Sequence, residues 1–231
     1  MVDGGSLHGT SLSDVVARFG RDVVGDAPLA ADGRLRFPIL VKLLDAADDL
    51  SVPDLCLEVL PHLLHHHRFQ LVVLGKGEPR YEEFFRLLAQ AYPHRVGYSS
   101  AFNEPRAHQV EAGADLFLMP SRYEPCGLIQ MYSLRYGTVP VVHKTGGLAD
   151  TVWPFDERTG RGTGFVFEHF DARGLSWAMR RALEVWGPGV GAHRERWRRL
   201  QRNGMDLPLG WRHRVGRYVE IYERLHGRSV G

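Results

Sequence analysis

The stretch ADLFLMPSRYEPCGLIQMYSLRYGTVPVVHKTGGLADTV, residues 114–152, contains two consecutive strand–loop–helix units. The first unit predicts an apolar strand at Ala114–Met119, a loop rich in proline and glycine, and a helix at Leu128–Tyr136. The second unit predicts a β-branched strand at Val139–Val142, a glycine turn and the start of another helix. Strands that alternate with helices, without a hairpin turn between them, are typical of a parallel sheet.

The rest of the chain continues this alternation. Four further strands are expected, at Phe37–Leu44, Phe69–Leu74, Arg95–Tyr98 and Thr163–Phe167. Helices separate them, and Asp171 is expected to cap the N-terminus of one of these helices. Six strands in this arrangement predict an α/β fold, a doubly wound parallel sheet of Rossmann-like type with its cleft beyond the carboxyl ends of the strands.

The N-terminal and C-terminal parts differ in pattern. Residues 1–34 are weakly patterned and are expected to form an arm with one short helix at Leu12–Val24, whereas residues 35–231 form one domain. The last helix is expected to place six apolar side chains on one stripe: Trp211, Val215, Tyr218, Val219, Tyr222 and Leu225.

Composition excludes several classes of function. The chain is 44% hydrophobic and 24% charged, as in ordinary soluble proteins, and its net charge of +2 gives no argument for nucleic acid. Two cysteines provide no disulfide framework, and no secretory signal or run of about 18 apolar residues is present. We therefore expect a cytoplasmic protein that contacts no membrane.

A cluster of basic residues and a cluster of histidines are each expected to lie on a helix surface without binding a ligand. The basic run at residues 193–199 includes Trp197 and is expected to be the solvated face of a helix. The triplet His65-His66-His67 is expected to lie at a helix end, where consecutive side chains point in different directions and hold no metal together.

The two loops of residues 114–152 indicate what kind of ligand the cleft accepts. Each loop leads into a helix, and the first backbone amides of a helix have no partner within it. These amides and the helix dipole favour an anion. Because the two helix starts are adjacent, with Glu124 and Cys126 between them, the pattern predicts a site for a phosphorylated ligand.

Several motifs resemble the donor site of bacterial glycogen synthases and plant starch synthases. They are SRYEPCGL at 121–128, RYGTVPVV at 135–142, TGGLADTV at 145–152, GKGEPRYEEFF at 75–85, Gly97-Tyr98, Thr163-Gly164-Phe165 and the C-terminal segment 201–225. That family consists of retaining glucosyltransferases with the two-domain GT-B architecture. The resemblance covers roughly residues 36–225, and it implies that the chain is the C-terminal, nucleotide-sugar-binding half of such an enzyme.

The resemblance also implies roles for single residues. Glu124 matches the glutamate that contacts the donor sugar and is needed for transfer, and the alternative is a surface carboxylate. Backbone amides of Cys126, Gly127 and Leu128 are implied to face the sugar, with Cys126 as a packing residue and no nucleophile.

The resemblance also implies roles for the glycine turn at 145–147, for Tyr98 and for the glycines at 75 and 77. Thr145, Gly146 and Gly147 are expected to place amides near the distal phosphate, because glycine allows close approach of the main chain. Tyr98 matches a position beside the adenine ring, with an aromatic core residue as the alternative, and Gly75 and Gly77 either approach the ribose or simply turn the chain.

The chain departs from the family in its phosphate cations. The family uses an arginine and a lysine that fall near Ala46 and Ser51, but the sequence here is LLDAADDLS (residues 43–51), with three aspartates. Loss of two charge-assisted contacts, each worth about 1.5–3 kcal/mol, weakens diphosphate binding about a hundredfold or more. Of the lysines that could compensate (Lys42, Lys76 and Lys144), Lys144 is best placed, beside the glycine turn.

A second departure concerns the acceptor. GT-B enzymes place an acceptor-binding domain before this one, and residues 1–34 are too short to form it. We therefore expect a separate chain to supply that domain, and little turnover by this chain alone.

The leading hypothesis is transfer of glucose from ADP-glucose or UDP-glucose to an α-1,4-glucan, with no metal or other cofactor. One alternative is a degenerate domain that binds a nucleotide sugar or regulates without catalysis. Another is a different nucleotide-sugar enzyme on the same sheet, such as an epimerase or a transferase for another acceptor.

Overall fold

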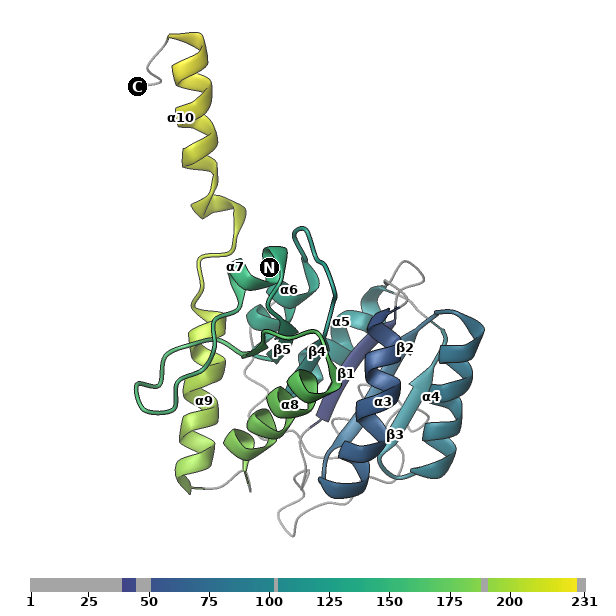
Figure 1. Cartoon of the computed structure of the whole chain (residues 1–231). Helices are drawn as coiled ribbons and strands as arrows, with labels where there is room; N and C mark the ends of the chain where they lie inside the picture. The colour runs from purple at the N-terminus through teal and green to yellow at the C-terminus, as the bar shows by residue number, and fades with distance from the viewer. Residues whose placement is uncertain (1–38, 45–50, 102–103, 188–190, 228–231) are drawn as a thin grey trace.

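The computed structural model describes residues 39–44, 51–101, 104–187 and 191–227 (Figure 1). The expected arm at residues 1–34, its helix at Leu12–Val24, and the acidic residues 45–49 with the position of the family's arginine at Ala46 lie outside the described residues.

Six parallel strands form one sheet with the order β3-β2-β1-β4-β5-β6. The strands are β1 (Ile39–Leu44), β2 (Gln70–Gly75), β3 (Val96–Ser99), β4 (Leu116–Met119), β5 (Val139–His143) and β6 (Phe165–Phe167). The direction of winding reverses where β4 pairs with β1, with Leu40 opposite Leu116. The doubly wound parallel sheet expected from the sequence is thereby confirmed, and ligands of such sheets bind where the order reverses.

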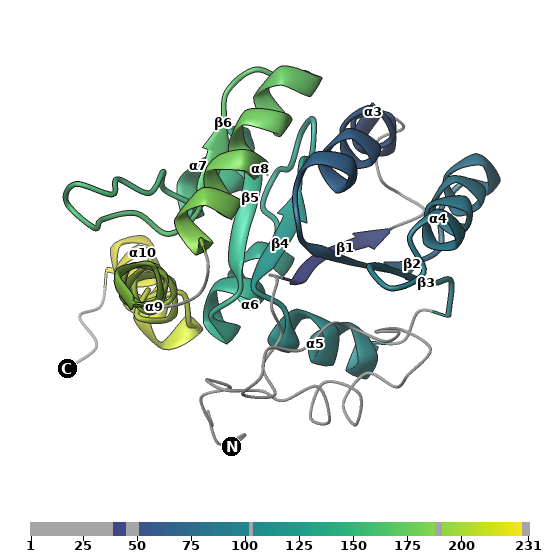
Figure 2. The ribbon, with the colours of Figure 1, turned by 90° about the horizontal axis from the view of Figure 1, so that it is seen from below.

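Helices cover both faces of this sheet (Figure 2). They are α3 (Ser51–His66), α4 (Pro79–Ala91), α5 (Glu104–Gly113), α6 (Ile129–Tyr136), α7 (Gly146–Thr151), α8 (Ala172–Trp186), α9 (Gly191–Met205) and α10 (Val215–His226), with a 3-10 turn η1 at Trp211–His213. All the helices expected after residue 50 are present, with bounds that differ by a few residues.

The sheet separates two hydrophobic cores. Residues of α3, α4 and α8 pack with alternate residues of the strands in one core, for example Leu60, Phe85 and Met179. Residues of α5, α6 and α7 form the second core with the other alternate residues, for example Val110 and Leu148. The period-2 alternation of side chains along each strand places them on opposite faces, so both faces are buried.

Two helix predictions are confirmed in detail. The Asp171 carboxylate accepts a hydrogen bond from the Gly174 amide over 2.7 Å and caps α8. In α9, Trp197 and Leu200 are buried while its arginines face outward in part, as expected for a helix with a basic outer face.

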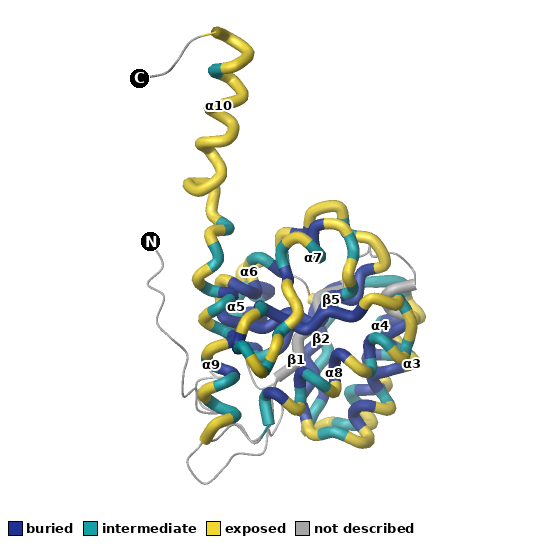
Figure 3. Tube along the Cα trace, turned by 60° about the vertical axis from the view of Figure 1, so that its left-hand side comes forward, coloured by how far each residue is buried: buried dark blue, intermediate teal, exposed yellow. Residues whose placement is uncertain are grey.

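Helix α10 extends away from the sheet (Figures 1 and 3). The predicted apolar stripe is present but is exposed: Leu225 of α10 is 74% exposed, and Trp211, which lies in η1 and not in the last helix as predicted, is 64% exposed. Helix α10 contains no buried residue, and Glu223 is its one half-buried residue.

Candidate functional site

The two loops of the motif-rich stretch lie side by side at the carboxyl edge of the sheet. Strands β4 and β5 are paired neighbours, with Met119 opposite Val142, so the segments that follow them leave the sheet together. Residues 120–128 follow β4 and lead into α6, and residues 144–145 follow β5 and lead into α7. The sequence predicted this juxtaposition, and the structure confirms it.

The loops also contact each other directly. The Gly147 amide donates a hydrogen bond to the carbonyl oxygen of Glu124 over 2.9 Å. A Cβ atom at Gly146 would overlap the Glu124 carbonyl group, and one at Gly147 would overlap the Cys126 carbonyl group. Gly146 also has φ +39, so both glycines are needed for the close approach of the two main chains.

The Glu124 carboxylate lies at this junction and is unpaired with respect to the described residues. Its main-chain carbonyl accepts from Gly147, whereas its side chain is half-buried and has no hydrogen-bond or ion-pair partner among the described residues. A carboxylate in this position can accept hydrogen bonds from the hydroxyls of a bound sugar.

The residues after Glu124 form the start of α6. Gly127 is buried and has φ +68, which favours glycine, and Leu128 is 54% exposed. Cys126 is exposed and its thiol forms no disulfide, so this residue lies outside the hydrophobic core. Whether the amides of this segment face a sugar stays a prediction.

Lys144 lies at the site, and its positive charge is paired with a carboxylate. Its Nζ is 2.5 Å from Oε1 of Glu168, which follows β6, and both side chains are exposed. The hydrogen bond from Lys144 holds the pKa of the Glu168 carboxyl below its usual value. The lysine proposed from the sequence as a phosphate cation is therefore already paired with a carboxylate.

His143, which the sequence analysis did not select, joins three strand ends. Its Nδ1 is 2.9 Å from the carbonyl oxygen of Ser121, and its Nε2 is 3.3 Å from that of Glu168. Its ring also contacts Phe170, above which the Arg122 guanidinium lies at 4.9 Å. Neither pattern nor spacing distinguished this histidine, because the contact depends on the lateral order β4-β5-β6.

Tyr98, Gly75 and Gly77 lie at the same edge of the sheet, but on the β2 and β3 side of β1. The Tyr98 ring packs 6.2 Å from the ring of Phe85, and its hydroxyl is buried. Burial, with the nearby Glu82 carboxylate, raises the pKa of Tyr98 to about 12. These contacts favour the core alternative for Tyr98.

The two glycines of this loop differ in their surroundings. Gly75 is buried at the end of β2 with φ 129, whereas Gly77 has open space where a Cβ would lie. The Gly77 amide donates to Glu82 Oε1 over 3.2 Å. A turn of the chain accounts for both, and a contact with a ribose stays a prediction.

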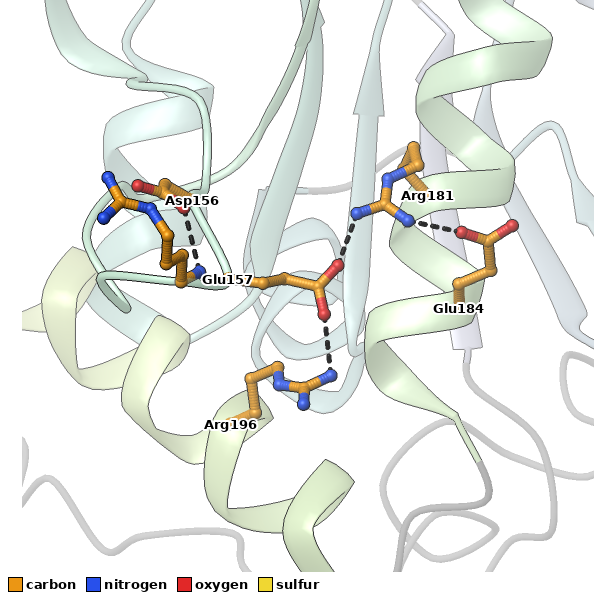
Figure 4. Close-up of polar contacts among 6 residues, drawn as sticks. Asp156, Glu157, Arg181, Glu184 and Arg196 are labelled. Carbon is orange, nitrogen blue, oxygen red and sulfur yellow. Dashed lines mark hydrogen bonds and ion pairs between the residues drawn. The ribbon is translucent and has the colours of Figure 1, made fainter.

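The segment between α7 and β6 is fixed to two helices (Figure 4). Glu157 accepts hydrogen bonds from Arg181 of α8 and from Arg196 of α9, the latter over 2.7 Å. Asn203 of α9 donates to the carbonyl oxygens of Gly160 and Gly162 over 2.9 and 2.8 Å. Helix α7 is therefore followed by a segment that is anchored at several points.

The described residues form neither a metal site nor a membrane span. They contain no group of three or more His, Cys, Asp or Glu side chains that could hold a metal ion, the histidines at 65–67 included. Within the same part of the chain, each helix is too short or too polar to cross a bilayer.

Comparison with known proteins identifies the family. The family model "Glycosyl transferases group 1" matches residues 51–203, which is most of the chain. The chain belongs to the group 1 glycosyl transferases.

Curated glycogen synthases are among the relatives of this chain. That of Anaeromyxobacter dehalogenans is 51% identical over 172 residues, covering 74% of this chain and 35% of the relative. Those of Geobacillus thermodenitrificans and Gloeobacter violaceus are 47% and 43% identical, covering 71% and 82% of this chain and 33% and 40% of their own length. The chain thus spans between a third and two fifths of these relatives.

Solved structures agree with the sheet described above. The catalytic domain of Arabidopsis thaliana starch synthase IV, determined with ADP and acarbose, has a TM-score of 0.71 and 26% identity, covering 95% of this chain and 45% of that one. Sucrose-phosphate synthase of Thermosynechococcus elongatus shares the fold at TM-score 0.58 and 21% identity, over 90% of this chain and 51% of its own. The GT-B fold class expected from the sequence is confirmed.

Proposed function

We propose that this chain is the donor-binding half of a glycogen/starch synthase-like glucosyltransferase. The reaction is transfer of glucose from ADP-glucose, with UDP-glucose as the alternative donor, to the non-reducing end of an α-1,4-glucan with retention. The observation that supports it most is the junction of the two loops, where the Glu124 carboxylate lies beside main chain fixed by Gly146 and Gly147.

Each group has a role in this proposal. The Glu124 carboxylate accepts hydrogen bonds from sugar hydroxyls and stabilises the positive charge that develops on the sugar as the bond to the diphosphate breaks. Amides of residues 126–128 bind the sugar, and those of 145–147 bind the distal phosphate. No metal or organic cofactor takes part.

The acceptor requires a further domain. The relatives are about twice as long as this chain, and a cleft between two domains excludes water from the reaction. We propose that a domain in another chain or segment binds the glucan. The exposed apolar stripe of η1 and α10, from Trp211 to Leu225, is the surface on which we place its contact.

A second candidate is a domain that binds a nucleotide sugar, or regulates, without catalysis. The pairing of Lys144 with Glu168 favours it, because this ion pair leaves less positive charge for a diphosphate. The aspartates of LLDAADDLS favour it for the same reason.

Titration calorimetry with ADP, ADP-glucose and UDP-glucose tests the proposal. We expect binding of ADP-glucose, and a loss of at least about tenfold in its affinity, but not in that of ADP, in Glu124→Gln, because only the sugar contacts this carboxylate. The matched control is Glu184→Gln on α8, which should change neither affinity. Binding without any transfer, after the acceptor domain of a glycogen synthase is added, favours the second candidate. Absence of binding by folded protein rejects the proposed transfer and leaves, of the second candidate, a regulatory domain that binds no nucleotide sugar.

A further inference from the structure

Gln130, the second residue of α6, is fully buried behind the loop that contains Glu124. Its Nε2 lies 3.1 Å from the carbonyl oxygen of Cys126 and 2.7 Å from that of Gly127. The same nitrogen lies 3.1 Å from Oγ1 of Thr151, the last residue of α7. One side chain thus reaches both loop-helix units of the site.

These contacts form a closed circuit. The Thr151 hydroxyl accepts from Gln130 and donates to the carbonyl oxygen of Gly147 over 2.7 Å. The Gly147 amide in turn donates to the carbonyl oxygen of Glu124 over 2.9 Å. Glu124, Gly147, Thr151 and Gln130 therefore link the first loop to the second at two separate places.

The chemistry of the circuit requires an amide at position 130. All three partners of Nε2 offer oxygen atoms, so they bind the donor end of the amide and fix its orientation. A carboxylate there would face three oxygens in a buried place and would lose these hydrogen bonds. A Cβ at Gly127 would overlap the Gln130 amide, so the left-handed glycine and the glutamine fit together.

Burial of the Gln130 side chain also lowers the stability of the fold. Its Oε1 is buried and has no hydrogen-bond partner among the described residues. An unsatisfied buried acceptor costs about 1–3 kcal/mol, and an apolar side chain of similar shape would avoid that cost. A buried polar group with such a cost points to a role other than filling the core.

We propose that Gln130 is a positioning residue, which couples the Glu124 loop to α7 so that their ligand-facing amides keep one relative arrangement. The coupling is a property of the chain without ligand. Its consequence for binding of a sugar nucleotide rests on the proposed function.

Hydrogen exchange in the unliganded protein tests the coupling. In Gln130→Met and in Thr151→Val we expect exchange to accelerate by at least about tenfold in both segments, 120–128 and 144–151, because each substitution opens the circuit. Thr151→Ser keeps the hydroxyl and should behave as wild type. If one segment alone accelerates, or neither does, the coupling is rejected.

Gln201→Met is the matched control. The Gln201 Nε2 donates to the carbonyl oxygen of Gly137 over 2.7 Å, so this variant also removes a glutamine–carbonyl bond, but at the opposite end of α6. We expect no change of exchange in the two segments. Acceleration there equal to that of Gln130→Met would mean that general loosening of α6, rather than the circuit, governs the loops.

Titration with ADP-glucose separates the coupling from the proposed function. With the variants folded, we expect Gln130→Met and Thr151→Val to bind at least about tenfold more weakly, while Thr151→Ser and Gln201→Met bind as wild type. Unchanged affinity in variants that exchange faster overturns the inference for binding. Wild-type protein that fails to bind ADP-glucose rejects the proposed function, and the exchange result still decides whether Gln130 couples the loops.

Discussion

The main-chain amide of Gly147 donates to the carbonyl oxygen of Glu124 over 2.9 Å, and this bond joins two segments that leave adjacent strands. It holds the first turn of α7 against the loop before α6. The candidate site therefore depends on how closely two main chains approach, as much as on any side chain.

Gly147→Ala should disrupt this approach. Its Cβ would overlap the backbone of Cys126, which cannot rotate away, so we expect a loss of about 1–3 kcal/mol in the free energy of unfolding. We also expect binding of ADP-glucose to weaken at least about tenfold in protein that remains folded. Urea denaturation and calorimetry measure the two effects. Gly77→Ala is the control, because nothing lies within 4 Å of its Cβ position, and equal effects of both substitutions would contradict the prediction.

Substitutions at Lys144 and Glu168 test whether the lysine binds the diphosphate of the ligand. If the lysine can bind the diphosphate, Glu168→Gln should release it and raise the affinity for ADP by about threefold, whereas Lys144→Ala should lower it by a similar factor. Both changes should shrink at high salt, since both side chains are exposed. Glu83→Gln, which removes another exposed partner of a basic residue, should leave ADP binding unchanged. An unchanged affinity in Lys144→Ala would remove this lysine from the site.

The order of strands and helices could be predicted because each element has its own local signal. Apolar runs such as Phe69–Leu74 define buried strands, and Asp171 marks the start of α8. Parallel strands then leave all their carboxyl ends at one edge, so the two loops of residues 114–152 had to meet.

Contacts between distant residues could not be predicted in this way. The pairing of Lys144 with Glu168 depends on the β5–β6 neighbourhood, and the burial of Gln130 depends on where α7 crosses α6. A glutamine in a helix usually faces solvent, so its sequence context gave no signal. Tyr98 could not be assigned to the hydrophobic core or to the ligand site, because alternation along a strand does not show which face of the sheet each side chain occupies. The roles in donor binding and the cytoplasmic location stay predictions.

Glu157 should stabilise the segment between α7 and β6. It is bound by Arg181 and Arg196 from two helices, and its side chain is only 30% exposed (Figure 4). We expect Glu157→Gln to lower the free energy of unfolding by about 1–2 kcal/mol, since two partly buried charge pairs are weakened. Thermal or urea unfolding measures this. Glu195→Gln removes an exposed pair with Arg198 on α9 and should cost less than about 0.5 kcal/mol. A similar loss in the two variants would contradict a special role for Glu157.

Glu111 should make stability depend on pH. The residue is 2% exposed on α5, and burial raises the pKa of its carboxyl from 4.5 to about 7. Within the described part of the chain, His108 faces this carboxylate, with Nδ1 3.6 Å from Oε2. Because the folded state holds the proton more tightly than the unfolded state, the contribution of Glu111 to stability falls as pH rises from about 4.5 to about 7.

The free energy of unfolding falls by at most about 3 kcal/mol above pH 7, because the Glu111 carboxylate is then buried and charged. Glu111→Gln keeps the shape without the charge, so it should unfold at a higher temperature than wild type at pH 8, and at a similar temperature at pH 4.5. Unfolding curves between these two pH values measure the difference. Glu104→Gln, on the same helix with a side chain 83% exposed, should show no such pH dependence. Parallel pH profiles for wild type and Glu111→Gln would show that another group governs stability in this range.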